Sequence, residues 1–198
     1  MGAQARRVVW PTVGRALDQL AVEASMCTRC PLAAGRTQVV FGMGDPDADL
    51  MFVGEGPGAE EDRQGLPFVG RSGQLLDRLM FEEMGLTRAQ AYIANVVKCR
   101  PPGNRDPASE EIAACRPYLD EQLRLIAPKV VVTLGNFSTR LLLDTTDGIN
   151  KVRGRAYPYG EAQLIPTLHP AAALRGGGEP LAKMRSDLAR ARVALGAR

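Results

Sequence analysis

The 198-residue sequence contains a single histidine, His169, and aromatic residues make up only 5% of it. No apolar stretch approaches the roughly 18 residues of a membrane-spanning helix, so we expect no membrane span. The first residues, MGAQARRVVW, lack the apolar core and cleavage site of a signal peptide. Arg6 stands where an N-myristoylation signal requires serine or threonine. These absences predict a cytoplasmic protein.

Neither of the common phosphate-binding loops is present. No Gly-Lys-Ser/Thr occurs, which excludes a P-loop. The stretch GEGPGAEED (54–62) superficially resembles a dinucleotide fingerprint, but Pro57 lacks a backbone N–H and the acids at 60–62 would repel phosphate. The glycines instead predict a backbone shaped around a flat, uncharged group, on which Phe68 could stack. A plainer interpretation stays open, in which Phe68 is a buried hydrophobe and the acids form the first turn of a helix.

No excess of one charge dominates the chain, which has 25 Lys and Arg, 22 Asp and Glu, and a formal net charge of +3. This balance permits a nucleic-acid partner without requiring one. Several basic residues gather in short stretches or follow the histidine. From charge alone, a solvated basic surface is favoured over phosphate contacts for this set: Lys98, Arg100, Arg105, Arg153, Arg155 and Arg175.

Short apolar runs alternate with amphipathic segments along the chain. The pattern predicts strands at 49–54, 91–97, 129–135 and 162–170. It predicts helices at about 12–26, 72–86, 106–126, 136–144 and 179–195. The third of these helices has Pro107 in its first turn. Strands that alternate with helices indicate a parallel sheet covered on both faces, and the length suits one domain over residues 1–198.

Three informative stretches fall at the carboxyl ends of the predicted strands, where open α/β sheets bind their ligands. GEGPG follows the first strand, Asn95 lies near the end of the second, and His169 lies at the end of the last. A lone histidine is more often structural or exposed. The convergence of these stretches nevertheless favours a chemical role for His169.

The chain has only four cysteines, and in a reducing cytosol two structural disulfides are not expected. Cys27 and Cys30 form a C-x-x-C pair that can chelate one metal centre. Cys99 lies in a predicted loop and Cys115 in the following helix. This spacing leaves an iron–sulfur centre, a zinc site and unliganded cysteines all open.

Five motifs together resemble one known family, the iron–sulfur uracil-DNA glycosylases, the fourth family of the uracil-DNA glycosylase superfamily. The motifs are CTRCPLAAGRT, GEGPGAEED, GLPFVGRSGQLLDR, ANVVKCRPPGNRDP and TLHPAAALR, and they span about residues 24 to 192. The resemblance implies a three-layer α/β/α sandwich with a short central parallel sheet. It also implies a structural [4Fe–4S] cluster held by Cys27, Cys30, Cys99 and Cys115.

The resemblance implies that the chain acts on uracil-containing DNA, single- or double-stranded, and flips the uracil nucleotide out of the helix. Hydrolysis of the glycosidic bond then releases free uracil and leaves an abasic site. His169 would donate a hydrogen bond to uracil O2, where negative charge develops. The Asn95 amide would read uracil N3 and O4, and Phe68 would stack on the base. We expect the enzyme to be monomeric.

The resemblance assigns further residues to the walls of the pocket, to the positioning of water and to DNA contact. Gly54, Glu55 and Gly56 would wrap the pocket, and Gly56 replaces an Asp or Asn that holds the water in other branches. Glu55 and Glu61 are therefore the candidates to position water; we assign the water to Glu55 and place Glu61 near uracil C5. Leu174 and Arg175, which follow the histidine in the sequence, would enter the gap left by the flipped base.

Two departures from related patterns bear on the mechanism. Ala171 replaces a serine, common in the family, that could bind a DNA phosphate. No basic loop is inserted after NVVKC and no second histidine occurs, so we expect turnover rather than a covalent adduct with DNA. Two other interpretations stay open from the residues, namely an iron–sulfur redox or nucleotide enzyme and a non-catalytic, zinc-containing nucleic-acid binder.

Overall fold

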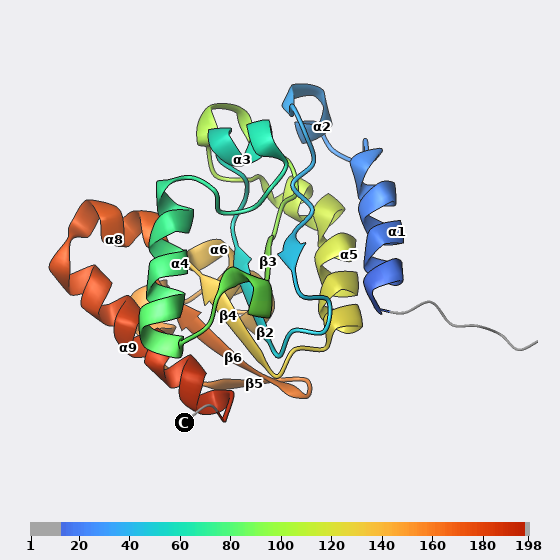
Figure 1. The fold of residues 1–198 in the computed structure, drawn as a ribbon. Coiled ribbons are helices and arrows are strands. Elements are labelled where there is room, and N and C mark those ends of the chain that lie inside the picture. Colours follow the sequence, from blue (N-terminus) through green and yellow to red (C-terminus); the bar gives the residue numbers. More distant parts are fainter. Residues whose placement is uncertain (1–12, 197–198) are drawn as a thin grey trace, which may run out of the picture.

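A six-stranded sheet lies between two layers of helices in a computed structural model, which describes residues 13–196 (Figure 1). The strand order is β1-β3-β2-β4-β6-β5. The four inner strands are parallel, and β1 and β5 pair antiparallel at the edges. The strands are β1 (Met43–Gly44), β2 (Leu50–Gly54), β3 (Tyr92–Asn95), β4 (Val130–Leu134), β5 (Tyr157–Tyr159) and β6 (Ala162–Thr167). The predicted α/β/α sandwich with a central parallel sheet is confirmed, although the two short edge strands were not predicted.

Helices α4, α8 and α9 cover one face of the sheet, and α1 and α5 cover the other (Figure 1). The α-helices within the described residues are α1 (Val13–Ser25), α2 (Leu32–Gly35), α3 (Ala59–Gln64), α4 (Arg71–Met84), α5 (Ser109–Ile126), α6 (Asn136–Leu143), α7 (Ile149–Val152), α8 (Pro170–Gly176) and α9 (Gly178–Ala194). Two short 3-10 helices, η1 (Arg88–Gln90) and η2 (Pro102–Asn104), lie in the connections.

The central strands β2 and β4 are buried along their whole length and consist almost entirely of apolar residues, as expected for strands that are covered on both faces. In β2, Phe52 faces the core shared with α4 and α9, whereas Met51 and Val53 face the core shared with α1 and α5. These residues are fully buried. The two cores hold the strands rigidly, so that the loops at their carboxyl ends have a fixed base.

Two predicted boundaries were wrong by three residues, and the predicted ends of the strand at 91–97 and the helix at 72–86 were each two residues too late. Helix α5 begins at Ser109 rather than at 106, and Pro107 precedes it, because the Glu111 carboxylate accepts the Ala108 N–H at 2.8 Å and caps the helix there. Strand β6 ends at Thr167 rather than at 170, because His169 is already the N-cap of α8.

The predictions of no signal peptide and no myristoylation concern residues outside those that the structure describes, as does the first residue of the predicted helix 12–26. Between residues 13 and 196, no helix combines the length and the apolar character needed to cross a membrane.

Candidate active site

A cleft of about 770 Å³ opens beyond the carboxyl ends of β2, β3 and β6, a size typical of ligand sites. The structure brings most of the predicted site residues to its walls: Glu55, Gly56, Glu61, Phe68, Asn95, His169 and Arg175. Gly54 lies directly behind Asn95 and Phe68. Leu174 is not part of the lining and is partly exposed on α8. The predicted residues therefore bring an amide, an imidazole, two carboxylates, a guanidinium group and an aromatic ring to one cleft.

Asn95 ends strand β3 with its side chain almost fully buried. Its Oδ1 has no hydrogen-bond partner among the described residues. A Cβ on Gly54, its register partner in β2, would lie 2.4 Å from this oxygen and 2.5 Å from the Phe68 ring. Only glycine leaves room for both side chains. A buried acceptor without a partner indicates a ligand that supplies an N–H or O–H donor.

His169 is held as a neutral donor. Its Nδ1 accepts the Ala171 N–H at 3.2 Å, so the proton of the neutral ring is on Nε2. Burial first, and then the Arg175 guanidinium, lower the pKa of His169 to about 4. Its ring centroid lies 5.8 Å from that of Phe68. An uncharged N–H donor and an aromatic ring thus flank the same space.

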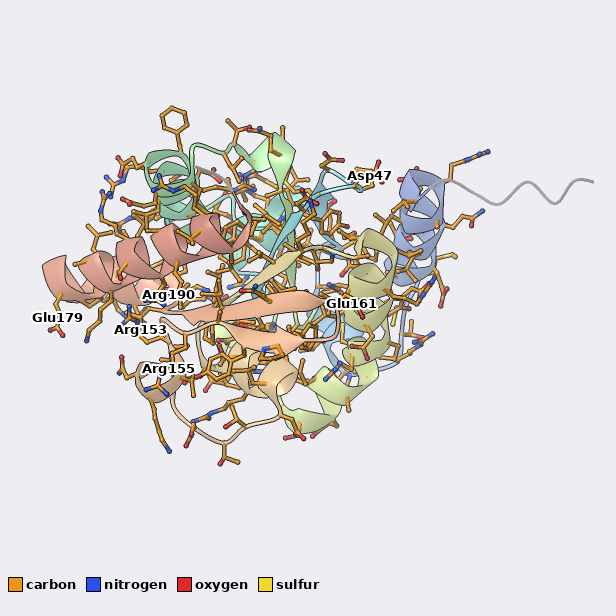
Figure 2. The ribbon with its side chains drawn as sticks, turned by 90° about the horizontal axis from the view of Figure 1, so that it is seen from below. Asp47, Arg153, Arg155, Glu161, Glu179 and Arg190 are labelled. Atoms are coloured by element: carbon orange, nitrogen blue, oxygen red, sulfur yellow. The ribbon has the colours of Figure 1, made fainter. Side chains whose placement is uncertain are left out.

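A buried ion pair anchors the end of β6, two residues before His169. The Asp187 carboxylate accepts the Thr167 hydroxyl at 2.6 Å and the Arg153 guanidinium at 2.6 and 2.9 Å. Arg153 and Arg190, which also acts on Asp187, are labelled in Figure 2 at this edge of the molecule. The prediction of a solvated Arg153 was therefore wrong, since its guanidinium joins the end of α7 to α9.

The two candidate carboxylates differ in their partners. Burial, with a smaller contribution from the charge of Asp106, raises the pKa of Glu55 to about 7. Glu61 is engaged by the backbone: its Oε1 accepts the Val69 and Gly70 N–H groups, both at 2.9 Å, and its Oε2 accepts that of Gly58 at 3.1 Å. Glu55 is therefore suited to proton transfer, whereas Glu61 holds the surrounding loop. Asp106 lies within the motif ANVVKCRPPGNRDP, but no role in the site was predicted for it.

The four cysteines line a second, apolar cavity between α1, α2, the loop after β3, and α5. All four are free thiols. Backbone and side-chain N–H groups approach two of the sulfurs: Arg36 Nη1 lies 3.5 Å from Cys99 Sγ, and Lys98 N lies 3.2 Å from Cys115 Sγ. Over residues 13–196, no group of three or more His, Cys, Asp or Glu side chains is placed to hold a single metal ion.

Lys98 does not belong to a basic surface, contrary to the prediction. Its side chain is fully buried, and its Nζ donates to the Asn95 carbonyl at 2.8 Å and to Gln122 Oε1 at 2.6 Å. The backbone N–H of the same residue bonds the Cys115 sulfur. Lys98 therefore joins the cysteine cavity to the strand that carries Asn95.

The part of the chain that forms the sheet and the cleft matches a known protein superfamily. Residues 41–191, which contain the whole cleft, match the family model described as the uracil DNA glycosylase superfamily. The matched residues include the parallel strands and the cleft at their carboxyl ends.

Similar proteins narrow the class. The chain is 49% identical over 166 residues to a type-4 uracil-DNA glycosylase of Sulfurisphaera tokodaii, covering 80% of this chain and 76% of the relative. It is 48% identical to the type-4 enzymes of Saccharolobus solfataricus and Thermotoga maritima, covering 80% of this chain and 77% and 83% of those relatives. The chain belongs to the type-4 uracil-DNA glycosylase family.

Proposed function

We propose that this chain hydrolyses the N-glycosidic bond of flipped-out deoxyuridine in DNA, as the first step of base excision repair. One observation carries the proposal: the buried, unpartnered Asn95 Oδ1 shares a cleft with the Nε2–H of His169 and the Phe68 ring. Uracil offers an N3–H donor, two carbonyl acceptors and a flat face, which complement these three groups. Free uracil and an abasic site are the products.

The mechanism assigns one task to each group. Phe68 stacks on the base, and the Asn95 amide accepts from N3–H and donates to O4. His169 Nε2–H donates to O2 as the C1′–N1 bond breaks and its electron pair passes to the base. A water adds to C1′ of the sugar, and the Glu55 carboxylate takes its proton. Glu61 stays assigned to the uracil C5 side of the pocket, and Gly54 and Gly56 to its wall.

The rate of excision is expected to depend on the ionisation of Glu55. Its pKa of about 7 means that the carboxylate, the form that accepts a proton, is lost as the pH falls below that value. The single-turnover rate should therefore rise about tenfold per pH unit up to pH 7 and level off above it. His169, with a pKa of about 4, adds no step in this range. Rapid-quench assays between pH 5 and 9 measure the profile.

Glu55→Gln is the matched control, because it keeps the size of the side chain and cannot titrate. This variant should be slow at every pH and show no step near 7. A wild-type profile that stays flat from pH 5 to 9 would contradict the assignment of Glu55 as the base.

The cysteine residues fit a [4Fe–4S] cluster, which needs four thiolates around one cavity and N–H groups near their sulfurs. Cys27, Cys30, Cys99 and Cys115 would hold it. When bound, the cluster supplies a structural cross-link between the N-terminal helices and α5.

Removal of one cluster ligand should cost stability. Cys115→Ser is expected to lose the brown colour and iron content and to lower Tm by about 10 °C or more, because metal binding contributes directly to folding. Iron and sulfide analysis with a thermal melt tests this. Met26→Ser, an exposed neighbour of the pair, serves as control and should change neither. A colourless wild-type protein that contains zinc would refute the cluster and favour a zinc-type binder.

The function itself is tested with a labelled uracil-containing oligonucleotide, single- or double-stranded, followed by alkaline cleavage of abasic sites. Strand breaks at uracil alone are expected. Leu174 and Arg175 would contact the DNA beside the flipped nucleotide, and the enzyme would act as a monomer in the cytoplasm. Failure of an iron-loaded protein to cleave either substrate would overturn the proposal.

A further inference from the structure

Phe68 has an unusual backbone for a residue that presents an aromatic ring to a site. Its φ of 53° lies in the left-handed region, which is rarely occupied by side chains of this size. The ring is buried and faces His169. Strained conformations of this kind persist only where the surrounding structure fixes them. The contacts that fix Phe68 therefore decide where its ring stands.

Arg88 supplies two of these contacts from outside the cleft. This residue begins η1, and its Nη1 and Nη2 donate to the carbonyls of Pro67 and Phe68 at 2.7 and 2.5 Å. The Asp77 carboxylate on α4 orients the guanidinium, accepting from Nε at 3.0 Å and from Nη2 at 2.9 and 3.1 Å. Arg88 does not line the cleft. It can influence the site only through the loop that it binds.

The next two backbone N–H groups are held from the other side. Glu61 Oε1 accepts the N–H groups of Val69 and Gly70. The Arg88 cation thus binds two successive carbonyl groups, and the Glu61 anion binds the next two N–H groups. Gly73 of α4 completes the fit, since a Cβ there would lie 1.7 Å from the Phe68 carbonyl oxygen. Four consecutive residues thus have their backbone polar groups fixed by charged side chains.

We propose that Arg88 is a positioning residue for base recognition, which it serves by holding the Phe68 ring in its stacking position. Asp77 acts with it by orienting the guanidinium fork, a geometry that lysine cannot reproduce. The inference rests on the proposed function, in which Phe68 stacks on the flipped uracil. A purely structural role, in which Arg88 only ties η1 to α4, predicts lost stability without a change in uracil affinity.

A double-mutant cycle separates the two roles, with the inhibition constant of free uracil and the KM of a single-stranded uracil oligonucleotide as readouts. Arg88→Met is expected to raise both about tenfold, because base–aromatic stacking is lost, and to change kcat less. In a Phe68→Ala background, the same substitution should have no further effect on either constant, since the two residues act as one unit. Arg88→Lys, which keeps a single donor group, should show a smaller loss and carries the test if Arg88→Met does not fold.

Arg185→Met is the matched control. Arg185 also pairs with carboxylates on α4, Glu82 and Glu83, but on the side that packs with α9. Its loss should lower Tm and leave the uracil affinity unchanged. Equal losses from Arg88→Met in both backgrounds, or a lower Tm with unchanged uracil affinity, would overturn the inference. These results differ from failure of the proposed function, in which the wild-type enzyme excises no uracil at all.

Discussion

Replacement of His169 by alanine is expected to slow uracil excision by about 100- to 1,000-fold, the usual cost of removing one preorganised donor to a developing anion. The Nδ1 atom of the ring is occupied by the Ala171 N–H, so Nε2–H is the group that is lost. Its low pKa means that the donor is a neutral imidazole at working pH. Single-turnover excision from a labelled oligonucleotide measures the change.

His169→Gln tests whether a donor is what matters, because its amide N–H could replace Nε2–H. Part of the activity should return in this variant. DNA affinity, measured by fluorescence anisotropy, should change little in both variants. A loss of less than tenfold in His169→Ala would mean that another group stabilises the departing base.

The second large effect is expected from Asn95→Asp. Within residues 13–196, the Asn95 Oδ1 has no hydrogen-bond partner, and the substitution replaces the amide nitrogen that would donate to uracil O4. Uracil excision should fall about 1,000-fold or more, since buried polar groups left unpaired give large discrimination. A protonated carboxyl group offers one O–H donor and one acceptor, the pattern that cytosine N3 and N4 require. Cytosine excision should therefore appear, and its rate relative to wild-type uracil excision at the same pH should increase as the pH falls.

Asn95→Ala, measured in the same assay, separates the gain of cytosine excision from the loss of uracil excision. It removes the amide without adding a carboxyl group, so it should lose uracil excision and gain no cytosine excision. If Asn95→Asp kept its preference for uracil, the assignment of Asn95 as the base-reading residue would be wrong.

The sequence predicted those parts of the fold that local patterns determine. The continuous apolar runs of β2 and β4 are visible in the sequence because both faces of these strands are buried. Edge strands β1 and β5, two and three residues long, have no comparable pattern, because pairing alone defines them. The end of β6 was misplaced for a related reason, since nothing before Pro170 reveals that His169 caps a helix.

For the site, the motifs identified Asn95 and His169, which lie at strand ends. They could not identify Arg88, which acts on Phe68 across 20 residues of sequence. They included Asp106 without revealing that its charge adds to the effect of burial in raising the pKa of Glu55. For Lys98, the prediction from the sequence was wrong. A lysine near arginines suggests a basic surface, but the fold buries this side chain. Contacts between distant segments carry no local pattern.

The cleft residues are spread along the sequence, so they are synthesised at different times during translation. They come from the end of β2, the loop around Phe68, the end of β3 and the start of α8, which lies close to the C-terminal helix α9. A chain still emerging from the ribosome has most of the pocket but lacks the histidine, and the closing helix arrives last. Copies that stop before residue 169 are therefore expected to lack excision activity, because they lack the donor to the departing base.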